Sequence, residues 1–389
     1  MKTARRLDRI EPFYVMECAK AAREIEVTAS RPMLYLNIGE PDFTAAPLVV
    51  EAAERALRAG ATQYTQALGT PELREAIARW YGTHFGIAVA PERVVVTAGA
   101  SAALQLVTLA LLDDGDEVLL PDPSYPCNRH FVAAAGGRAV LLPTTPAQRF
   151  QLDAAAVAAA WGAKTRGVLL ASPSNPTGTS IARDEMRRIV DVVCARGGFT
   201  IVDEIYLGLS YDEAFGHTAL EHALEHGDDV IVLSSFSKYF GMTGWRLGWL
   251  VLPESLVPAV EKLAQNLYIC ASSIAQAAAL ACFEPASLAE YERRRAAFKA
   301  RRDFIVPALE RLGLPVPVVP DGAFYAWFDA SAKSASSWDF VFETMRRAQV
   351  ALTPGRDFGV AAPERFVRLS FASSLDTLQA AVDRLGTVW

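Results

Sequence analysis

A run of small residues follows a short apolar segment at positions 94–97. Gly99, Ala100 and Ser101 come directly after that segment and precede a stretch long enough to form a helix. Small side chains let the backbone approach a ligand closely, and the free N–H groups at the start of a helix favour an anion such as phosphate. The pattern therefore predicts a phosphate site where the strand passes into the helix.

Residues later in the chain supply chemistry that suits such a site. Ser235, Ser237 and Arg246 offer hydroxyl donors and a cation for the same phosphate dianion. Asp203 ends an apolar run, and a buried carboxylate there needs a cationic partner. Lys238 also follows an apolar run, whose surroundings favour a neutral, nucleophilic amine. A phosphate site, a carboxylate that awaits a cationic ring nitrogen and a nucleophilic lysine together fit pyridoxal 5'-phosphate (PLP).

The segments between these residues predict the elements that position them. Short apolar runs alternate with helix-length segments through the middle of the chain. This alternation is typical of a mostly parallel, doubly wound α/β sheet whose strands are covered on both faces. The predicted strands cover residues 93–97, 117–120, 139–142, 167–171, 199–202, 230–234 and 245–251.

The last quarter of the chain has a different pattern. Residues 286–312 form a long charged stretch with the helical period, followed by short predicted strands at 323–328 and 366–371. This indicates a second, smaller α+β domain. The arginine clusters 293–295 and 301–302 are expected to lie on a solvated face of the long helix.

Composition limits the classes of partner and the compartment. Among 389 residues, 38 Lys and Arg against 44 Asp and Glu give a net charge of −6, which offers no electrostatic reason to bind nucleic acid. The five cysteines form no C-x-x-C pair, which suits a reducing cytoplasm and disfavours a disulfide scaffold. No secretory signal is evident at the N-terminus. The uncharged stretches 94–112 and 265–283 contain polar residues, so we do not expect membrane spans.

A different interpretation of the same residues is a serine hydrolase. Ser101 is centred in a G-x-S-x-A turn that is similar to a nucleophile elbow, and Asp203 with His217, His222 or His226 would complete a triad. His222 and His226 are also spaced four apart, as in a metal pair, but the glutamate of H-E-x-x-H is missing. The histidines are expected to lie on an exposed polar helix, and no metal ligand is predicted.

Short motifs spread over the whole chain carry a family resemblance. They are 37–43 (Asn-Ile-Gly-Glu-Pro-Asp-Phe), 63–64 (Gln-Tyr), 69–74 (Gly-Thr-Pro-Glu-Leu-Arg), 97–103, 122–126 (Asp-Pro-Ser-Tyr-Pro), 172–178 (Ser-Pro-Ser-Asn-Pro-Thr-Gly), 203–206 (Asp-Glu-Ile-Tyr), 235–238, 241–246 (Gly-Met-Thr-Gly-Trp-Arg), 354–355 and 368–370. In these motifs and their order the chain resembles the class I/II aminotransferases, the aspartate-aminotransferase-like PLP enzymes of fold type I.

The resemblance implies a role for each matching residue. Lys238 would form a Schiff base with PLP and then shuttle a proton between the substrate Cα and the cofactor. Asp203 would keep the pyridine nitrogen protonated, so that the ring accepts electrons. Asn175 and Tyr206 would donate to the ring O3′, and Tyr125 would stack on the ring face. The catalytic set implied is Lys238, Asp203 and Tyr206.

The resemblance also implies the phosphate and substrate contacts. Arg368 would clamp the substrate carboxylate, assisted by Asn175 and the backbone at Gly39. Tyr64 would reach the phosphate in the neighbouring subunit, so the active unit would be a homodimer. The Asn175–Pro176 bond is expected to be cis. The phosphate contacts within one subunit would come from Ala100, Ser101, Ser235, Ser237 and Arg246.

For the whole protein the resemblance implies the PLP-dependent transferase fold of type I, with a mostly parallel seven-stranded sheet. A large domain would cover residues 46–281, and a small α+β domain would combine 1–45 with 282–389. The expected activity is ping-pong transfer of an amino group from an L-amino acid to a 2-oxo acid, in the cytoplasm, with no nucleic-acid or membrane partner. A PLP-dependent lyase, decarboxylase or synthase of the same fold is the alternative.

Two positions depart from the family pattern. Aspartate-specific members bind the second carboxylate with an extra cation, which in one bacterial group is a lysine at the position of Ser101. Neither Arg23 nor Arg129 is a supported replacement. An unpaired carboxylate would bind poorly in a desolvated pocket, so we expect an amino donor with a neutral side chain. Phe13 stands where relatives often have serine, in a segment that borders the substrate entrance.

Overall fold

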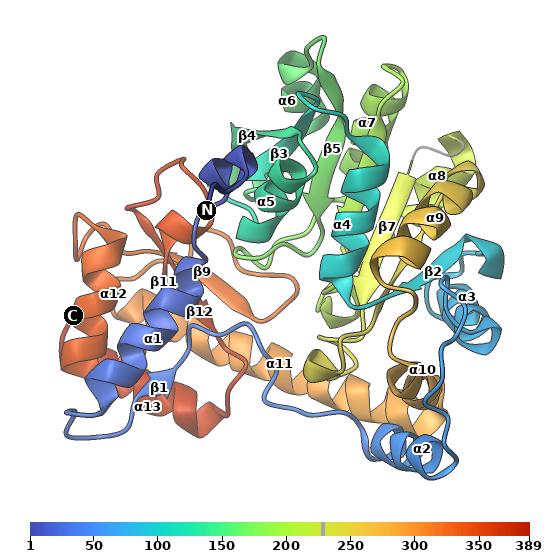
Figure 1. Cartoon of the computed structure of the whole chain (residues 1–389). Helices are drawn as coiled ribbons and strands as arrows, with labels where there is room; N and C mark the ends of the chain where they lie inside the picture. The colour runs from blue at the N-terminus through green and yellow to red at the C-terminus, as the bar shows by residue number, and fades with distance from the viewer. Residues whose placement is uncertain (227–229) are drawn as a thin grey trace.

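A seven-stranded sheet forms the centre of the computed structural model, which describes residues 1–226 and 230–389 (Figure 1). The strand order is β2-β8-β7-β6-β5-β3-β4. Only β8 runs antiparallel to its neighbours, so the predicted mostly parallel seven-stranded sheet is confirmed. The strands are β2 (Val94–Thr97), β3 (Glu117–Asp122), β4 (Arg138–Pro143), β5 (Thr165–Ala171), β6 (Phe199–Asp203), β7 (Val230–Ser235) and β8 (Gly248–Val251).

Helices cover both faces of this sheet, which explains the nearly continuous apolar character of the strands. Val94 and Val96 pack into one core with Ile77 and Ile189, whereas Val95 packs into a second core on the opposite face. The helices of this part are α2 (Pro47–Arg58), α3 (Pro71–Phe85), α4 (Ala100–Leu111), α5 (Pro126–Ala134), α6 (Ala154–Ala160), α7 (Arg183–Cys194), α8 (Leu220–His226), α9 (Val257–Leu267) and α10 (Ser273–Ala279).

The last strand of the sheet begins later than the sequence predicts. Residues 245–251 were expected to be extended, but Thr243–Trp245 forms a 3-10 turn and β8 begins at Gly248. Arg246 has a φ of 55°, and a residue in this left-handed conformation cannot continue a strand. The turn directs the Arg246 side chain towards Gly99 instead of placing it in the ladder.

The first and last parts of the chain fold together beside the sheet (Figure 1). Strands β1 (Leu34–Tyr35) and β10 (Val350–Ala351) pair in parallel, and β9 (Tyr325–Asp329), β12 (Phe366–Ser370) and β11 (Thr353–Pro354) form an antiparallel sheet. Both C-terminal strands predicted from the sequence are therefore present. The helices are α1 (Tyr14–Glu26), α11 (Pro285–Arg311), α12 (Ser337–Ala348) and α13 (Leu375–Gly386).

The arginine clusters of α11 do not lie wholly on a solvated face, which corrects the expectation. Arg294 and Arg301 are buried. Arg301 donates two hydrogen bonds of 2.8 Å to the carboxylate of Asp42, and Arg294 donates to the carbonyl oxygen of Thr44. These two arginines face inward because they fasten the extended segment around Asp42 to the helix.

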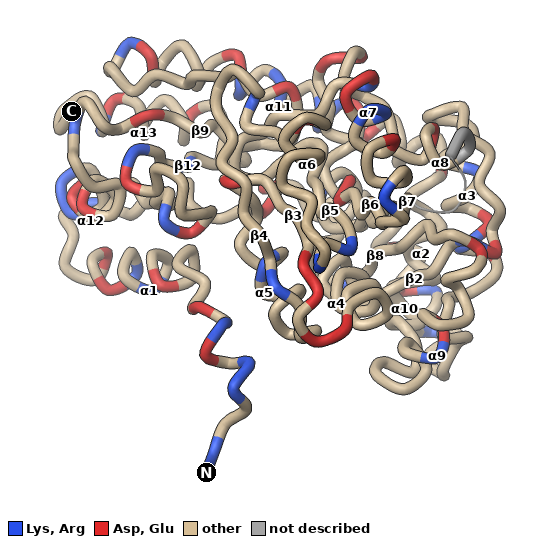
Figure 2. Tube along the Cα trace, turned by 90° about the horizontal axis from the view of Figure 1, so that it is seen from above, with Lys and Arg blue, Asp and Glu red and all other residues tan. Residues whose placement is uncertain are grey.

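Charged residues of both signs are interspersed along the outer helices and loops (Figure 2). This distribution agrees with the small net charge. Within the described ranges, we find no helix whose length and apolar character would let it cross a membrane.

Candidate active site

The residues predicted to carry the chemistry meet in one cavity of about 260 Å³. It lies at the carboxyl ends of β2, β5, β6 and β7, where ligands bind in open α/β sheets. Every predicted site residue except Tyr64 lines it. The lining consists of Phe13, Val15, Met16, Ile38, Gly39, Ala100, Ser101, Leu104, Tyr125, Ala171, Pro173, Asn175, Asp203, Ile205, Tyr206, Ser235, Ser237, Lys238, Arg246, Tyr325 and Arg368.

Lys238 presents a buried amine to this cavity. Its Nζ donates a 2.6 Å hydrogen bond to the carbonyl oxygen of Gly39. Burial lowers the pKa of Lys238 from 10.5 to about 8, against the opposing effect of the Glu40 carboxylate. An amine with this pKa is partly neutral near pH 7, which is the state that attacks a carbonyl carbon.

Asp203 is the last residue of β6 and is fully enclosed. Its Oδ1 accepts a 3.0 Å hydrogen bond from the backbone N–H of Ile205. Burial raises the pKa of Asp203 from 3.8 to about 7, although Ile205 and the Lys238 ammonium both favour the charged form. A cation beside a carboxylate in this environment would stabilise its charged form. A ligand bound in the cavity could carry that cation.

The residues for which the sequence predicts a phosphate site lie close together. Gly99 has a φ of 84° and directly precedes α4, whose first residues Ala100 and Ser101 line the cavity. A Cβ on Gly99 would lie 2.7 Å from a guanidinium nitrogen of Arg246, so a larger residue would force this guanidinium to shift. Ser235 donates a 3.0 Å hydrogen bond to Ser237 beside it. Backbone donors, hydroxyls and a guanidinium therefore converge on one end of the cavity.

Arg368 faces the other side of the cavity from β12. It is buried, with an exposed fraction of 2%. It donates hydrogen bonds of 2.8 Å to Asn175 Oδ1 and 2.6 Å to the carbonyl oxygen of Asn37. Its Nε has no hydrogen-bond partner among the described residues, and its guanidinium lies 4.5 Å from the ring centre of Tyr325. A buried cation with an unused donor suits a ligand carboxylate.

Tyr325 is a site residue that the sequence analysis missed. Its hydroxyl lies 2.7 Å from that of Tyr206, and its ring supports Arg368. The predicted strand at 323–328 was the signal that could have identified it, because alternate side chains of a strand point to the same face of the sheet. Tyr125 is also at the cavity, with Phe13 in edge contact at 6.2 Å. The Asn175–Pro176 bond is cis, as predicted.

Tyr64 lies apart from the other predicted site residues. Its exposed fraction is 80%, and it is absent from the lining of the cavity in its own chain. This position neither contradicts nor tests the expectation that Tyr64 serves a neighbouring subunit, so that role stays a prediction.

The histidines of the hydrolase hypothesis lie elsewhere. His217 Nε2 is 3.1 Å from the carbonyl oxygen of Ile181, and neither His217 nor His222 lines the cavity with Ser101. Both are buried, which corrects the expectation of an exposed helix: His222 is covered because α8 packs against α7 and β7, and His217 precedes this helix. The side chain of His226 lies outside the described part of the structure. The triad is therefore not assembled from His217 or His222.

Two relatives illustrate the similarity to known proteins. The valine–pyruvate aminotransferase of Mycobacterium tuberculosis is 38% identical over 378 residues, which cover 97% of this chain and 96% of that protein. The aspartate aminotransferase of Thermotoga maritima is 34% identical over 382 residues, which cover 98% of each chain.

Solved structures agree with the sequence relatives. A crystal structure of an aminotransferase from Mycobacterium tuberculosis superposes with a TM-score of 0.94 at 38% identity, covering 100% of this chain and 98% of that one. The aspartate aminotransferase from Thermus thermophilus with maleate gives a TM-score of 0.93 at 33% identity, covering 100% of both. The family model described as "Aminotransferase class I and II" matches residues 31–385. With this match over most of its length, the chain belongs to the class I and II aminotransferases.

Proposed function

We propose that this aminotransferase uses PLP attached covalently to Lys238, and that it moves the amino group of a neutral L-amino acid to a 2-oxo acid by a ping-pong mechanism. The observation that carries the proposal is that Lys238, Asp203 and the phosphate site at Gly99 border one cavity. The three features are matched to three parts of PLP: its aldehyde, its ring nitrogen and its phosphate.

The residues present fit this cofactor. The buried Asp203 supplies the counter-charge for a protonated pyridine nitrogen, and the start of α4 with Arg246 supplies donors for the phosphate. Tyr125, Asn175 and Tyr206 line the same cavity, where Tyr125 would cover the ring and the other two would offer polar atoms to its O3′. Bound there, PLP supplies a carrier for the amino group and an electron sink for the bond broken at Cα.

The chain's own groups then divide the work. Arg368 holds the substrate carboxylate and thereby fixes the orientation of Cα. Lys238 Nζ would act as the base that takes the proton from the substrate Cα, and it would deliver that proton to the carbon that accepts the amino group. Asp203 would face the ring nitrogen and favour its protonated form, because a buried carboxylate is stabilised by a cation beside it.

A neutral amino donor is supported by the charges around the cavity. The cations that line it are Lys238, Arg246 and Arg368, and each already has a proposed task. Arg129 is held by Glu11 and by the carbonyl oxygen of Asp357, and neither it nor Arg23 lines the cavity. The N-terminal segment contributes four apolar side chains to the lining of the cavity: Phe13, Val15, Met16 and Ile38. A second carboxylate would enter this region without a partner.

A panel of amino donors tests the proposal. With pyruvate as acceptor, we expect kcat/KM for valine, leucine or phenylalanine to exceed that for aspartate by at least about tenfold, because an unpaired carboxylate must be desolvated. The half-reaction is followed by the absorbance of bound PLP, and both products are quantified. Equal or better kcat/KM for aspartate contradicts the neutral-donor assignment. Release of ammonia or carbon dioxide instead of stoichiometric 2-oxo acid would favour the lyase or decarboxylase alternative.

The carboxylate clamp gives a second measurable expectation. Replacing Arg368 with Gln should lower kcat/KM for amino acids by about 10²–10³-fold, because the substrate carboxylate loses a buried, hydrogen-bonded cation. The same variant should react normally with a primary amine that lacks a carboxylate. Arg356→Gln, an exposed arginine paired with Glu364, is the matched control and should leave both substrates unaffected. An equal loss with both kinds of substrate would refute the clamp.

The proposal extends to the assembly, the domains and the location of the protein. We infer a homodimer in which Tyr64 contacts the phosphate held by its neighbour, a proposal supported by its exposure. We infer a large domain (46–281) and a small domain (1–45 and 282–389), because the seven-stranded sheet lies in the first and the two smaller sheets lie in the second. A cytoplasmic location is supported by five free cysteines.

A further inference from the structure

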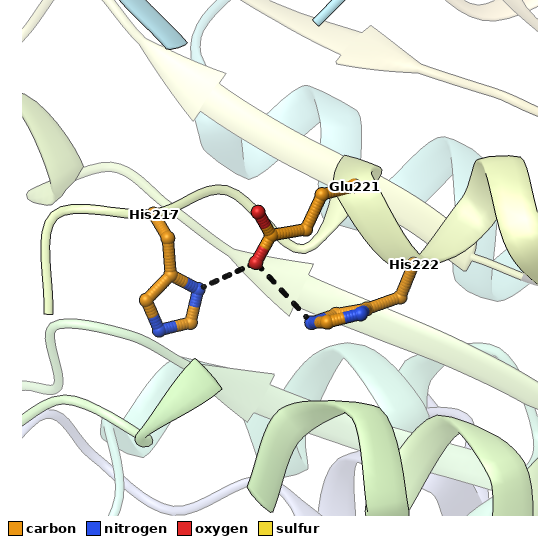
Figure 3. A group of neighbouring side chains, drawn as sticks. All are labelled: His217, Glu221 and His222. Atoms are coloured by element: carbon orange, nitrogen blue, oxygen red, sulfur yellow. Dashed lines mark ion pairs between the residues drawn. The ribbon is translucent and has the colours of Figure 1, made fainter. Parts of the chain in front are cut away.

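We propose that His217, Glu221 and His222 bind a divalent transition-metal ion, with Zn²⁺ as the best match, at a site separate from the active-site cavity. The three residues lie together at the start of α8, on the segment that connects β6 with β7 (Figure 3). None of them lines the cavity that holds Lys238. Two imidazoles and one carboxylate are a ligand set that zinc uses in proteins.

The distances between the donor atoms suit a small tetrahedral ion. One oxygen of Glu221, Oε1, is 3.4 Å from His217 Nδ1 and 3.5 Å from His222 Nε2, and both ring nitrogens point towards it (Figure 3). The three donor atoms all lie within 4.8 Å of one another. Zn–N and Zn–O bonds of about 2.0–2.2 Å place neighbouring ligand atoms about 3.3–3.6 Å apart in a tetrahedral site. The ion would therefore require only a small adjustment of these side chains.

The hydrogen bonding of His217 argues for a cation between the groups. Its Nε2 is 3.1 Å from the carbonyl oxygen of Ile181, so in the neutral ring this nitrogen carries the hydrogen and Nδ1 carries the lone pair. Nδ1 is buried without a hydrogen-bond partner and faces a carboxylate oxygen, so two acceptors oppose each other. A metal ion resolves that opposition, and metal-bound histidines commonly donate their other N–H to a backbone carbonyl.

The surroundings provide support and access. Arg183 binds the second oxygen of Glu221 at 2.9 Å, which orients the carboxylate with Oε1 towards the histidines. The Arg183 side chain is largely exposed, so solvent screens its repulsion of the ion. A surface pocket of about 150 Å³ reaches Glu221 and His222. It offers an entry path and room for a water molecule as the fourth ligand.

The position of the site indicates a structural effect. Thr218 and Ala219, which separate His217 from α8, both donate to the buried carboxylate of Glu204. A metal ion held by His217 and by α8 would therefore tie this connection in place, next to the strand that ends at Asp203. Occupancy should raise stability, and the ion has no part in the amino transfer.

The test uses the PLP-loaded enzyme after dialysis against a chelator, titrated with ZnCl₂. We expect one high-affinity ion per chain by calorimetry, and a rise in Tm of about 3 °C when zinc exceeds its Kd a hundredfold. Cobalt(II) in the same site should give the visible absorption of a four-coordinate ion. Saturable binding of one ion per chain supports the site. If the unaltered enzyme shows no such binding, the proposal is wrong, and this test does not depend on the folding of any variant.

Variants assign the ion to these residues. Glu221→Gln and the pair His217→Ala with His222→Ala should weaken zinc binding at least about tenfold and remove the rise in Tm. His84→Ala, on the surface of α3, is the matched control and should bind zinc as the unaltered chain does. If the double variant keeps the affinity, the ion is bound elsewhere, for example by a cysteine, and the proposal is wrong.

Discussion

Replacing Lys238 with Ala abolishes turnover, with a fall in kcat of at least about 10⁴-fold expected. This figure is the upper end of what a positioned proton-transfer group contributes, and Lys238 is also the proposed attachment point of the cofactor. The variant should still bind PLP through Asp203, Arg246 and the start of α4, but reversibly, because those contacts remain. The measurement is steady-state kinetics together with mass spectrometry after borohydride reduction, which fixes PLP to the unaltered chain only.

A matched control separates this effect from general damage. Lys262→Ala removes an exposed lysine of α9 and should leave both turnover and reducible attachment intact. A small primary amine added to the Lys238→Ala variant should restore part of the turnover, because it can replace the missing base in the cavity. Covalent PLP on the Lys238→Ala variant, or turnover near the normal rate, would refute the assignment of this lysine.

Much of the site could be predicted because its residues follow buried strands. Asp203 ends β6, and Ser235 ends β7 three residues before Lys238. The carboxyl ends of parallel strands meet at one edge of a sheet, so residues far apart in the sequence converge there. Local patterns were sufficient for this step. Gly99 could also be predicted from local sequence, because it follows a strand and adopts a positive φ directly before α4.

The parts that sequence analysis missed depend on contacts between distant segments. Tyr325 enters the cavity because β9 pairs with β12, and nothing local to Tyr325 specifies that pairing. Arg301 was expected in solvent, but Asp42 lies opposite it across 259 positions of sequence. His217 and His222 appear polar in the sequence, but both are buried: α8 packs against α7 and β7 at His222, and His217 contacts the backbone of Ile181. The burial of polar groups depends on tertiary packing, which the helix propensity and hydrophobic periodicity of a segment do not predict.

The role of Asp203 leads to the other large effect. Replacing Asp203 with Asn should lower kcat by about 10²–10⁴-fold and weaken PLP binding, because a protonated ring nitrogen loses its buried counter-charge. The apoenzyme should be at least as stable as before, since burial alone already disfavours this carboxylate and raises its pKa to about 7. A residue with a merely structural role would instead lower the Tm and leave the kinetics of the folded fraction unchanged. Kinetics, PLP titration and thermal unfolding of the apoenzyme separate these outcomes.

The neighbouring acid and an altered cofactor make the test specific. Glu204 is equally buried, but it accepts its hydrogen bonds from Thr218 and Ala219 and does not line the cavity. Glu204→Gln should therefore affect stability more than the rate of the folded enzyme. With a PLP analogue that carries carbon in place of the ring nitrogen, the Asp203→Asn variant and the unaltered enzyme should react at equal rates, because the carboxylate then has no cation to stabilise. A persistent difference of 10²-fold or more with that analogue would show that Asp203 acts on something other than the ring nitrogen.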